Sequence, residues 1–475
     1  MSITLGILRK KSRHGHMRDG GTQAVIAQVR SKGAALAGVE EANSHADRGP
    51  QVSLGEALGT FGLIGLLSFG GPAGQIATMH KVLVERKRWL DERTFLLALN
   101  FCTLLPGPEA MQLATYSGWR LLGVRGGLIA GMLFVLPGAI VIAALSLLYA
   151  VYGAMPSVTA AFLGIKAAVL AIVVEALLRI ARRSLQDGTE WIIAASAFVA
   201  IYFFKAPFPL IVLVAGIAGF LRVSEARMQE AIAHPHTTAV PLGQTLRTFA
   251  IWLAVWILPL LAVGWAFGKD HVLAKLALFF SMLAAVTFGG AYAVLAYMAQ
   301  DAVQLYGWLS PGEMLDGLGL AETTPGPLIL VTEFVGFIAA YRHGGGNPVL
   351  YGFLGAFVTL WATFAPSFLW IFTGAPYIGQ IAGLPRLAGA LSAVTAAVVG
   401  VILNLSVWFA LHVVFKEVPE VTAGPLRFSA PDFSSIDGTA AALAVTAGIA
   451  LFKFRLGMVT TLAICAALSL AASFL

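Results

Sequence analysis

The sequence predicts an all-α polytopic membrane protein built from two homologous halves of inverted topology. Three observations predict it: the composition, an internal repeat, and a charge difference between matched loops. Of the 475 residues, 58% are hydrophobic and 12% are charged, whereas soluble domains carry about 25% charged residues. Mean hydropathy is +0.82. Apolar runs long enough to cross a hydrocarbon core of roughly 30 Å follow one another from residue 54 onward.

The composition also excludes several classes of protein. The net charge of +7 comes largely from loops and the N-terminal stretch, as in membrane proteins whose Lys and Arg mark the cytoplasmic side, so we expect a lipid bilayer and no nucleic acid as partner. The two cysteines, Cys102 and Cys465, lie in apolar segments and imply no disulfide framework. No nucleotide-binding, zinc-hydrolase or serine-hydrolase motif is present, so we predict neither an enzyme nor a cofactor nor a metal site.

The chain repeats itself. "SFGGPAG" (68–74) matches "TFGGAYA" (287–293), and "LLPGP" (104–108) matches "TTPGP" (323–327), both 219 positions apart. Past the inserted "RHGGGN" (342–347) the spacing becomes 229 and pairs Pro137 with Pro366. A repeat of this length without gaps indicates two copies of one unit.

The repeat and the apolar segments define the expected boundaries. Residues 1–50 form a basic, largely disordered cytoplasmic tail, 51–222 the first half, 223–247 a cytoplasmic linker, 248–270 an unpaired transmembrane helix, and 271–475 the second half. The connector 80–93 carries five Lys or Arg, whereas its equivalent 299–316 carries none. Because Lys and Arg mark the cytoplasmic side, this difference favours inverted halves, the plan of many secondary transporters. We expect a bacterial cytoplasmic membrane, with the N-terminus in the cytoplasm.

Two apolar segments of each half are interrupted by helix breakers. "FGGP" (69–72) and "LPGP" (105–108) interrupt the first half, and their counterparts interrupt the second. If each interrupted segment enters the membrane, turns and leaves on the same side, all flanking arginines lie in the cytoplasm. The tips must then be buried in protein, because non-helical backbone is not tolerated in contact with lipid. Kinked helices that span the membrane are the alternative, and the sequence leaves both open.

These breaks suit an anion. Pro ends one helix and begins the next, and the new N-terminus offers free N–H groups and about half a positive charge. A lysine at membrane depth would add attraction. We therefore predict a substrate path along the following residues: Phe69, Gly70, Gly71, Pro72, Pro106, Gly107, Pro108, Glu109, Gln112, Lys166, Phe288, Gly289, Gly290, Thr323, Thr324, Pro325, Gly326 and Pro327.

Four carboxylates lie at membrane depth, where charge is costly and therefore suggests function. We expect Glu109, Glu175, Glu322 and Glu333 to be candidates for proton coupling. Two structural alternatives stay open. Glu109 and Glu322 could cap half-helices, and Lys166 with Glu175 could form a structural pair or reach an interface.

The sequence resembles the chromate ion transporter (CHR) family. The resemblance rests on "FGGPAGQIA" (69–77), "RKRWLDERTFLLAL" (86–99), "LPGPEAMQLATYSGW" (105–119), "FVLPGA" (134–139), "FGGAYAVLAYM" (288–298) and "TTPGPLILVTEFVGF" (323–337), and covers about residues 52–420. It implies export of chromate, a tetrahedral dianion, with chromate resistance as the result, and it implies that the "FGGP" and "PGPEA" residues contact the substrate. The repeat is imperfect, since Ala291 stands for Pro72 and Leu328 for Glu109.

Other functions remain open from the residues alone. A carrier for sulfate or a related oxyanion and a passive anion channel both fit the same scaffold, and we expect sulfate to compete with chromate. The oligomeric state is also open, with a homodimer as one alternative.

Overall fold

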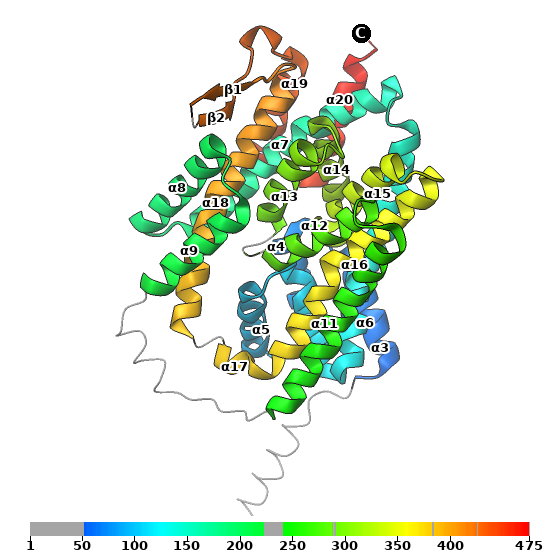
Figure 1. Ribbon diagram of the computed structural model, residues 1–475, viewed down its shortest axis with the longest axis vertical. Helices are drawn as coiled ribbons and strands as arrows, with labels where there is room; N and C mark the ends of the chain where they lie inside the picture. The colour runs from blue at the N-terminus through cyan, green and yellow to red at the C-terminus, as the bar shows by residue number, and fades with distance from the viewer. Residues whose placement is uncertain are drawn as a thin grey trace, which may run out of the picture. The chain divides into compact units, whose positions relative to one another are not determined.

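The structure is a computed structural model that describes residues 52–222, 241–286, 288, 291–381, 384–424 and 426–474 (Figure 1). The first half comprises α3 (Leu54–Leu67), α4 (Gly71–His80), the π-helical turn η1 (Lys81–Arg86), α5 (Glu92–Leu104), α6 (Glu109–Tyr152), α7 (Pro156–Ser184), α8 (Gly188–Phe204) and α9 (Phe208–Arg222). The connecting helix is α11 (Leu242–Phe267). The predicted tail lies outside the described residues, as does most of the predicted linker.

The second half repeats the elements of the first. It comprises α12 (Val272–Val286), α13 (Ala291–Gln300), η2 (Asp301–Leu305), α14 (Pro311–Thr323), η3 (Leu328–Leu330), α15 (Val331–His343), α16 (Pro348–Gly374), η4 (Ala375–Tyr377), α17 (Ile378–Ile381), α18 (Pro385–Val414), α19 (Gly438–Gly448), η6 (Ile449–Lys453) and α20 (Met458–Ala472). The spacing of 219 relates α5 to α14 residue by residue, and even the π-helical turn recurs. A third spacing, 250, relates α8 and α9 to α19 and α20.

Backbone conformation follows the same repeat. Gly107 (φ 123°) corresponds to Gly326 (φ 93°), and Lys205 (φ 51°) corresponds to Arg455 (φ 53°). A left-handed conformation is uncommon outside glycine, so its recurrence at matched positions confirms the two-copy organisation.

The interrupted segments fold back on themselves. In the first half Lys87 Nζ lies 2.8 Å from Glu56 Oε1, which brings the end of η1 to the start of α3. In the second half Arg342 at the end of α15 is ion-paired with Glu313 at the start of α14. Both pairs join the open ends of a hairpin whose tip is an FGG or PGP motif. The hairpin interpretation therefore describes these two interrupted segments, and a continuous kinked helix does not.

Equivalent helices of the two halves run in opposite directions. α6 breaks at Gly123 (φ 62°), and its second part packs against α16. Gly127 lies against Phe372, and Gly131 lies against Phe368. Residue numbers rise along one helix as they fall along the other, so the pair is antiparallel, as inverted halves require.

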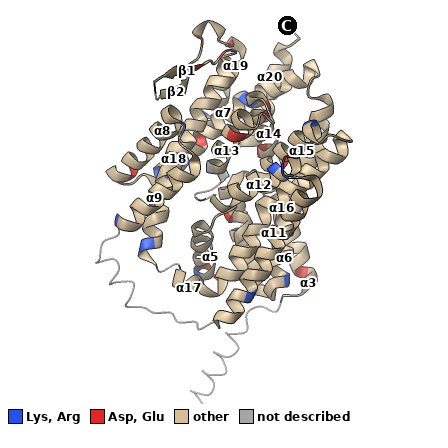
Figure 2. Cartoon of the chain, viewed as in Figure 1, with Lys and Arg blue, Asp and Glu red and all other residues tan. Residues whose placement is uncertain are grey.

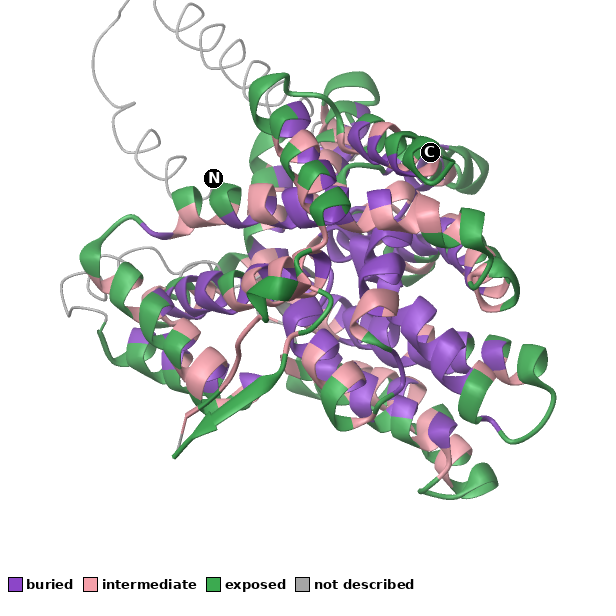
Figure 3. Ribbon diagram, turned by 90° about the horizontal axis from the view of Figure 1, so that it is seen from above, coloured by how far each residue is buried: buried purple, intermediate pink, exposed green. Residues whose placement is uncertain are grey.

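The halves also exchange their last helices. α7 packs against α19 and α20 of the second half, and α18 packs against α8 and α9 of the first (Figure 1). Helices approach each other closely at glycines, with Gly164 against the Cys465 backbone and Gly219 against Gly389. Small residues allow such contacts between membrane helices. Buried residues gather around the centre of the molecule (Figure 3).

Within the described residues, five helical segments are long and apolar enough to cross a membrane: α6, α7, α11, Pro348–Ile381 and α18. Charged residues are sparse along the helices, in agreement with a membrane setting (Figure 2). Two features differ from the sequence prediction. α11 begins six residues before the predicted helix start at 248. Between α18 and α19 the chain forms an antiparallel hairpin of β1 (Glu420–Ala423) and β2 (Leu426–Ser429), which the repeat could not predict because the first half has only three residues there.

Candidate functional site

The second PGP tip is held by the first half. The Gly326 N–H donates to the Ser68 carbonyl over 2.8 Å. The Gln75 side chain, from the second turn of α4, donates from Nε2 to the Gly326 carbonyl over 2.6 Å and is only 1% exposed. Both polar groups of one glycine are thus bound by the FGG hairpin of the other half. Sequence reasoning did not single out Gln75.

The first PGP tip is closed by its own helix and touches the second half. Gln112 Nε2 donates to the Pro106 carbonyl over 2.7 Å, and Ser367 on α16 faces Gly107. In the matching contact, Gly138 on α6 packs against the Pro325 carbonyl of the second tip. Gly138 and Ser367 are repeat equivalents. Each PGP tip therefore rests on the proline-containing helix of the opposite half.

The helices that begin at the tips differ in capping from α3 and α5. In the part of the chain that the structure describes, no side chain caps α4 at Gly70, α6 at Pro108 or η3 at Pro327, whereas Ser53 caps α3 and Asp91 caps α5. The first N–H groups of a helix have no partner inside the helix, so an uncapped N-terminus can bind an anion.

Unpaired polar atoms lie beside these N-termini. Among the described residues, the Oγ of Ser367 and the Oε1 atoms of Gln75 and Gln112 are buried without a hydrogen-bond partner. The Ser367 hydroxyl can donate one hydrogen bond, and each glutamine amide has a second N–H beyond the one that it donates to Gly326 or Pro106, whereas the unpaired Oε1 atoms can only accept. Buried polar atoms are almost always paired, so this arrangement indicates a place for a polar guest.

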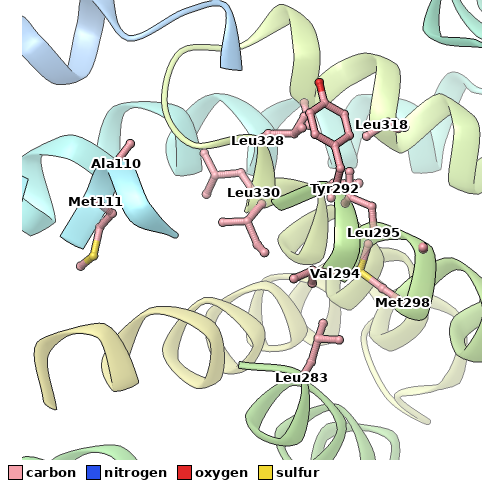
Figure 4. Close-up of a cluster of buried hydrophobic side chains, with 14 of the residues drawn as sticks. Ala110, Met111, Leu283, Tyr292, Val294, Leu295, Met298, Leu318, Leu328 and Leu330 are labelled. Carbon is pink, nitrogen blue, oxygen red and sulfur yellow. The ribbon is translucent and has the colours of Figure 1, made fainter. Parts of the chain in front are cut away.

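Buried apolar side chains lie next to the second PGP tip. Leu328 and Leu330, which follow the tip, lie beside Tyr292 and Leu295 of α13, while Ala110 lies at the start of α6 (Figure 4). All five are buried. Apolar surroundings lower the local dielectric and strengthen any hydrogen bond made at the tips.

The predicted carboxylates occupy different environments. Glu322 is 4% exposed and accepts a hydrogen bond from the Tyr292 hydroxyl over 2.9 Å. Glu333 is 1% exposed, and its Oε2 has no partner among the described residues. Glu109 is half-buried in the first turn of α6. The cap interpretation of Glu322 is wrong, because Glu322 lies near the C-terminal end of α14.

Lys166 and Glu175 do not pair with each other. Lys166 Nζ lies 3.3 Å from Asp316 Oδ2, which also accepts from the Tyr149 hydroxyl over 2.7 Å, and Glu175 pairs with Arg179. Nine residues along a helix place two side chains on opposite faces, so the predicted structural pair of Lys166 with Glu175 is wrong. Asp316 was overlooked, although a carboxylate within an apolar stretch is a signal in itself.

Other predicted residues lie around the tips. Thr324 is buried, Pro72 and Thr323 are half-buried, and Phe69, Gly70 and Phe288 leave part of their surface open. Gly71 and Pro325 are half-buried, and Gly289 and Gly290 lie outside the described residues. The other tip residues are buried: Pro106, Gly107, Pro108, Gly326 and Pro327.

Inverted halves with broken hairpins that meet inside the molecule define the class: a polytopic membrane transporter. The sequence profile of the chromate transporter family matches residues 55–220 and 274–470. The chain belongs to this family.

Named relatives agree. A chromate transport protein of Pseudomonas aeruginosa is 32% identical over 80% of this chain and 86% of its own length. A probable chromate transport protein of Synechococcus elongatus is 29% identical over 74% of this chain and 84% of its own. A chromate transport protein of Cupriavidus metallidurans is 27% identical over 74% and 82%. No solved structure matches the chain.

Proposed function

We propose that the protein is a secondary transporter that exports chromate from the bacterial cytoplasm and thereby confers chromate resistance. The observation that carries the proposal is the binding of Gly326 by Ser68 and Gln75, which joins the tips of opposite halves in the interior. A tetrahedral dianion has oxygens for several N–H donors at once, and the relatives are named for chromate transport.

The contact at Gly326 acts as a gate in this proposal. Its N–H is occupied by the Ser68 carbonyl, so the two hairpins are closed against each other. Separation of the hairpins frees that N–H for an oxyanion, and the substrate then replaces a contact that the protein otherwise makes with itself. Because the halves are inverted, separation on one side or the other gives access to one face at a time.

The membrane potential suffices to drive export. In this orientation the N-terminus and the Lys/Arg-rich connectors face the cytoplasm. Moving a negative charge out of a negative-inside cell releases about 2.3 kcal/mol per charge per 100 mV. Glu322 and Glu333, buried close to the second tip in sequence, are candidates for proton coupling that would add to this force.

Chromate accumulation in chromate-sensitive bacteria tests the proposal. Cells with the wild-type protein should accumulate less chromate than cells with the empty vector, and Gln75→Leu should abolish the difference because it removes the donor to Gly326. Gln244→Leu, at an exposed position on α11, is the matched control and should behave as wild type. All variants are compared at equal membrane expression.

Two outcomes would decide against export. Unchanged accumulation with well-expressed wild-type protein would exclude chromate as substrate. Raised accumulation that excess sulfate suppresses would identify an uptake carrier shared by sulfate.

A further inference from the structure

A second charged feature lies away from the tips, at the C-terminal end of α7. A cavity of about 920 Å³ opens there between α7 of the first half and the end of η6 of the second. Its charged lining consists of Glu175, Arg179, Arg182, Arg183 and Arg455. We call these four arginines and their cavity the arginine vestibule.

Most of this positive charge is not neutralised. Arg179 pairs with Glu175, whereas Arg182, Arg183 and Arg455 form no ion pair within the described part of the chain. Guanidinium groups donate in a planar fork that matches the oxygens of an inorganic oxyanion. The Arg455 backbone has a positive φ of 53° and lies within a turn that is closed by a hydrogen bond from the Leu456 N–H to the Ala450 carbonyl over 3.0 Å.

Helix α7 connects the vestibule with the interior site. It carries three of the four arginines at its C-terminal end, and it packs against α14, the helix that ends at the second PGP motif.

The repeat provides an internal comparison. At the equivalent place in the other half, Trp408, Leu411 and His412 stand for Arg179, Arg182 and Arg183. The cavity there is about 20 Å³. Its one lining cation, Lys205, the counterpart of Arg455, lies 3.7 Å from Glu420 on β1, and Tyr202 donates to the Ser429 carbonyl on β2 over 2.9 Å. The β-hairpin thus closes the position that is open and basic in its counterpart.

We propose that the arginine vestibule is a loading site that binds the substrate oxyanion at the cytoplasmic face before it reaches the PGP tips, and that the opposite face has no such site. The identity of the cargo rests on the proposed function, while the site itself requires only a small inorganic oxyanion. A basic cleft raises the local anion concentration and the rate of encounter. It speeds loading from one side without changing the final gradient that the driving force permits.

Everted membrane vesicles, which expose the cytoplasmic face, test the proposal. Chromate uptake is measured against concentration at low and high salt for wild type, the double variant Arg182→Gln/Arg455→Gln, and Arg247→Gln on α11 as a control that removes an exposed arginine elsewhere. The double variant should raise the half-saturating concentration about tenfold, leave the maximal rate nearly unchanged and lose most of the salt dependence. The control should match wild type.

A binding measurement distinguishes failure of the loading site from failure of the proposed function. Sulfate and chromate binding to the purified protein is measured in nanodiscs with and without phosphatidylglycerol. Loss of oxyanion binding in the double variant supports the loading site even if wild-type vesicles take up no chromate, a result that would refute only the proposed cargo. Unchanged half-saturation and binding in the double variant would overturn the loading site. Arginine-dependent binding of phosphatidylglycerol without oxyanion binding would also overturn it, since a lipid headgroup would then occupy the cavity.

Discussion

Gly107 determines the backbone conformation and the packing of the first PGP tip. Its φ of 123° lies where side-chain-bearing residues are strained. A Cβ at this position would lie 2.7 Å from Gln112 Nε2 and 3.0 Å from Ser367 Oγ. Ser367 Oγ is unpaired, whereas Gln112 Nε2 donates to the Pro106 carbonyl, so a methyl group would crowd the hydroxyl and disturb the hydrogen bond that closes the tip.

We therefore expect Gly107→Ala to abolish chromate export and to destabilise the protein by about 1–3 kcal/mol through backbone strain. Transport in cells and the midpoint of thermal unfolding in detergent measure the two effects. Gly59→Ala on α3 is the control, because nothing lies within 4 Å of its Cβ position and its backbone is helical. Equal effects of the two substitutions would show that the tip has no special role.

The sequence predicted single residues only in part. Glycine adopts positive φ angles easily and proline interrupts a helix, so both PGP tips were predicted as turns. Lys166 was predicted as an attractor for anions, yet its charge is matched by Asp316, 150 positions away. Local patterns do not encode the partner of a buried charge when that partner comes from another helix.

At the scale of elements, the Lys166–Asp316 pair joins α7 of one half to α14 of the other, and Tyr149 adds α6. It fixes one arm of the second PGP hairpin against the opposite half. Removing one partner of a buried ion pair costs about 3–5 kcal/mol, whereas replacing both with apolar residues can cost little.

This contrast predicts the outcome of a double-mutant cycle. Asp316→Leu should strongly lower the unfolding midpoint, and Lys166→Met/Asp316→Leu should restore much of the loss. The exposed pair Lys87–Glu56, at 2.8 Å, serves as control and should give a coupling of about 1 kcal/mol or less. If Lys166→Met alone abolishes transport while the unfolding midpoint stays unchanged, Lys166 serves the anion directly, as the sequence suggested.

The breaks themselves were readable from sequence, but the pairing of the hairpins was not. α5 and α14 start at Asp91 and Ser310, both of which accept a backbone N–H as caps, and both helices end at a PGP motif. Caps and breaks are local signals. The contact between the first FGG hairpin and the second PGP tip depends instead on how the two halves pack. The repeat gave no indication of it, because Val294 stands at the position equivalent to Gln75.

At the scale of the whole molecule, the repeat and the loop charges predicted two inverted halves, and the antiparallel packing of α6 and α16 agrees. The exchange of the last helices between halves was beyond prediction, because it requires contacts between the two copies. The inserted β-hairpin is the largest departure from symmetry, and it closes one cavity while the arginine vestibule stays open. The two ends of the molecule therefore differ, because one member of this pair of equivalent cavities is closed and the other is open and basic.

The inverted arrangement predicts opposite faces for the two ends of α8. This helix has 17 residues, about 25 Å. It starts next to the arginine-rich end of α7 and ends where Tyr202 and Lys205 contact the β-hairpin. Thr189→Cys should react with an impermeant maleimide only from the cytoplasmic side, and Arg427→Cys only from the outer side. Cys102 and Cys465 are buried and should give little background. Labelling of both new cysteines from one side would refute the inverted topology, even if chromate transport were intact.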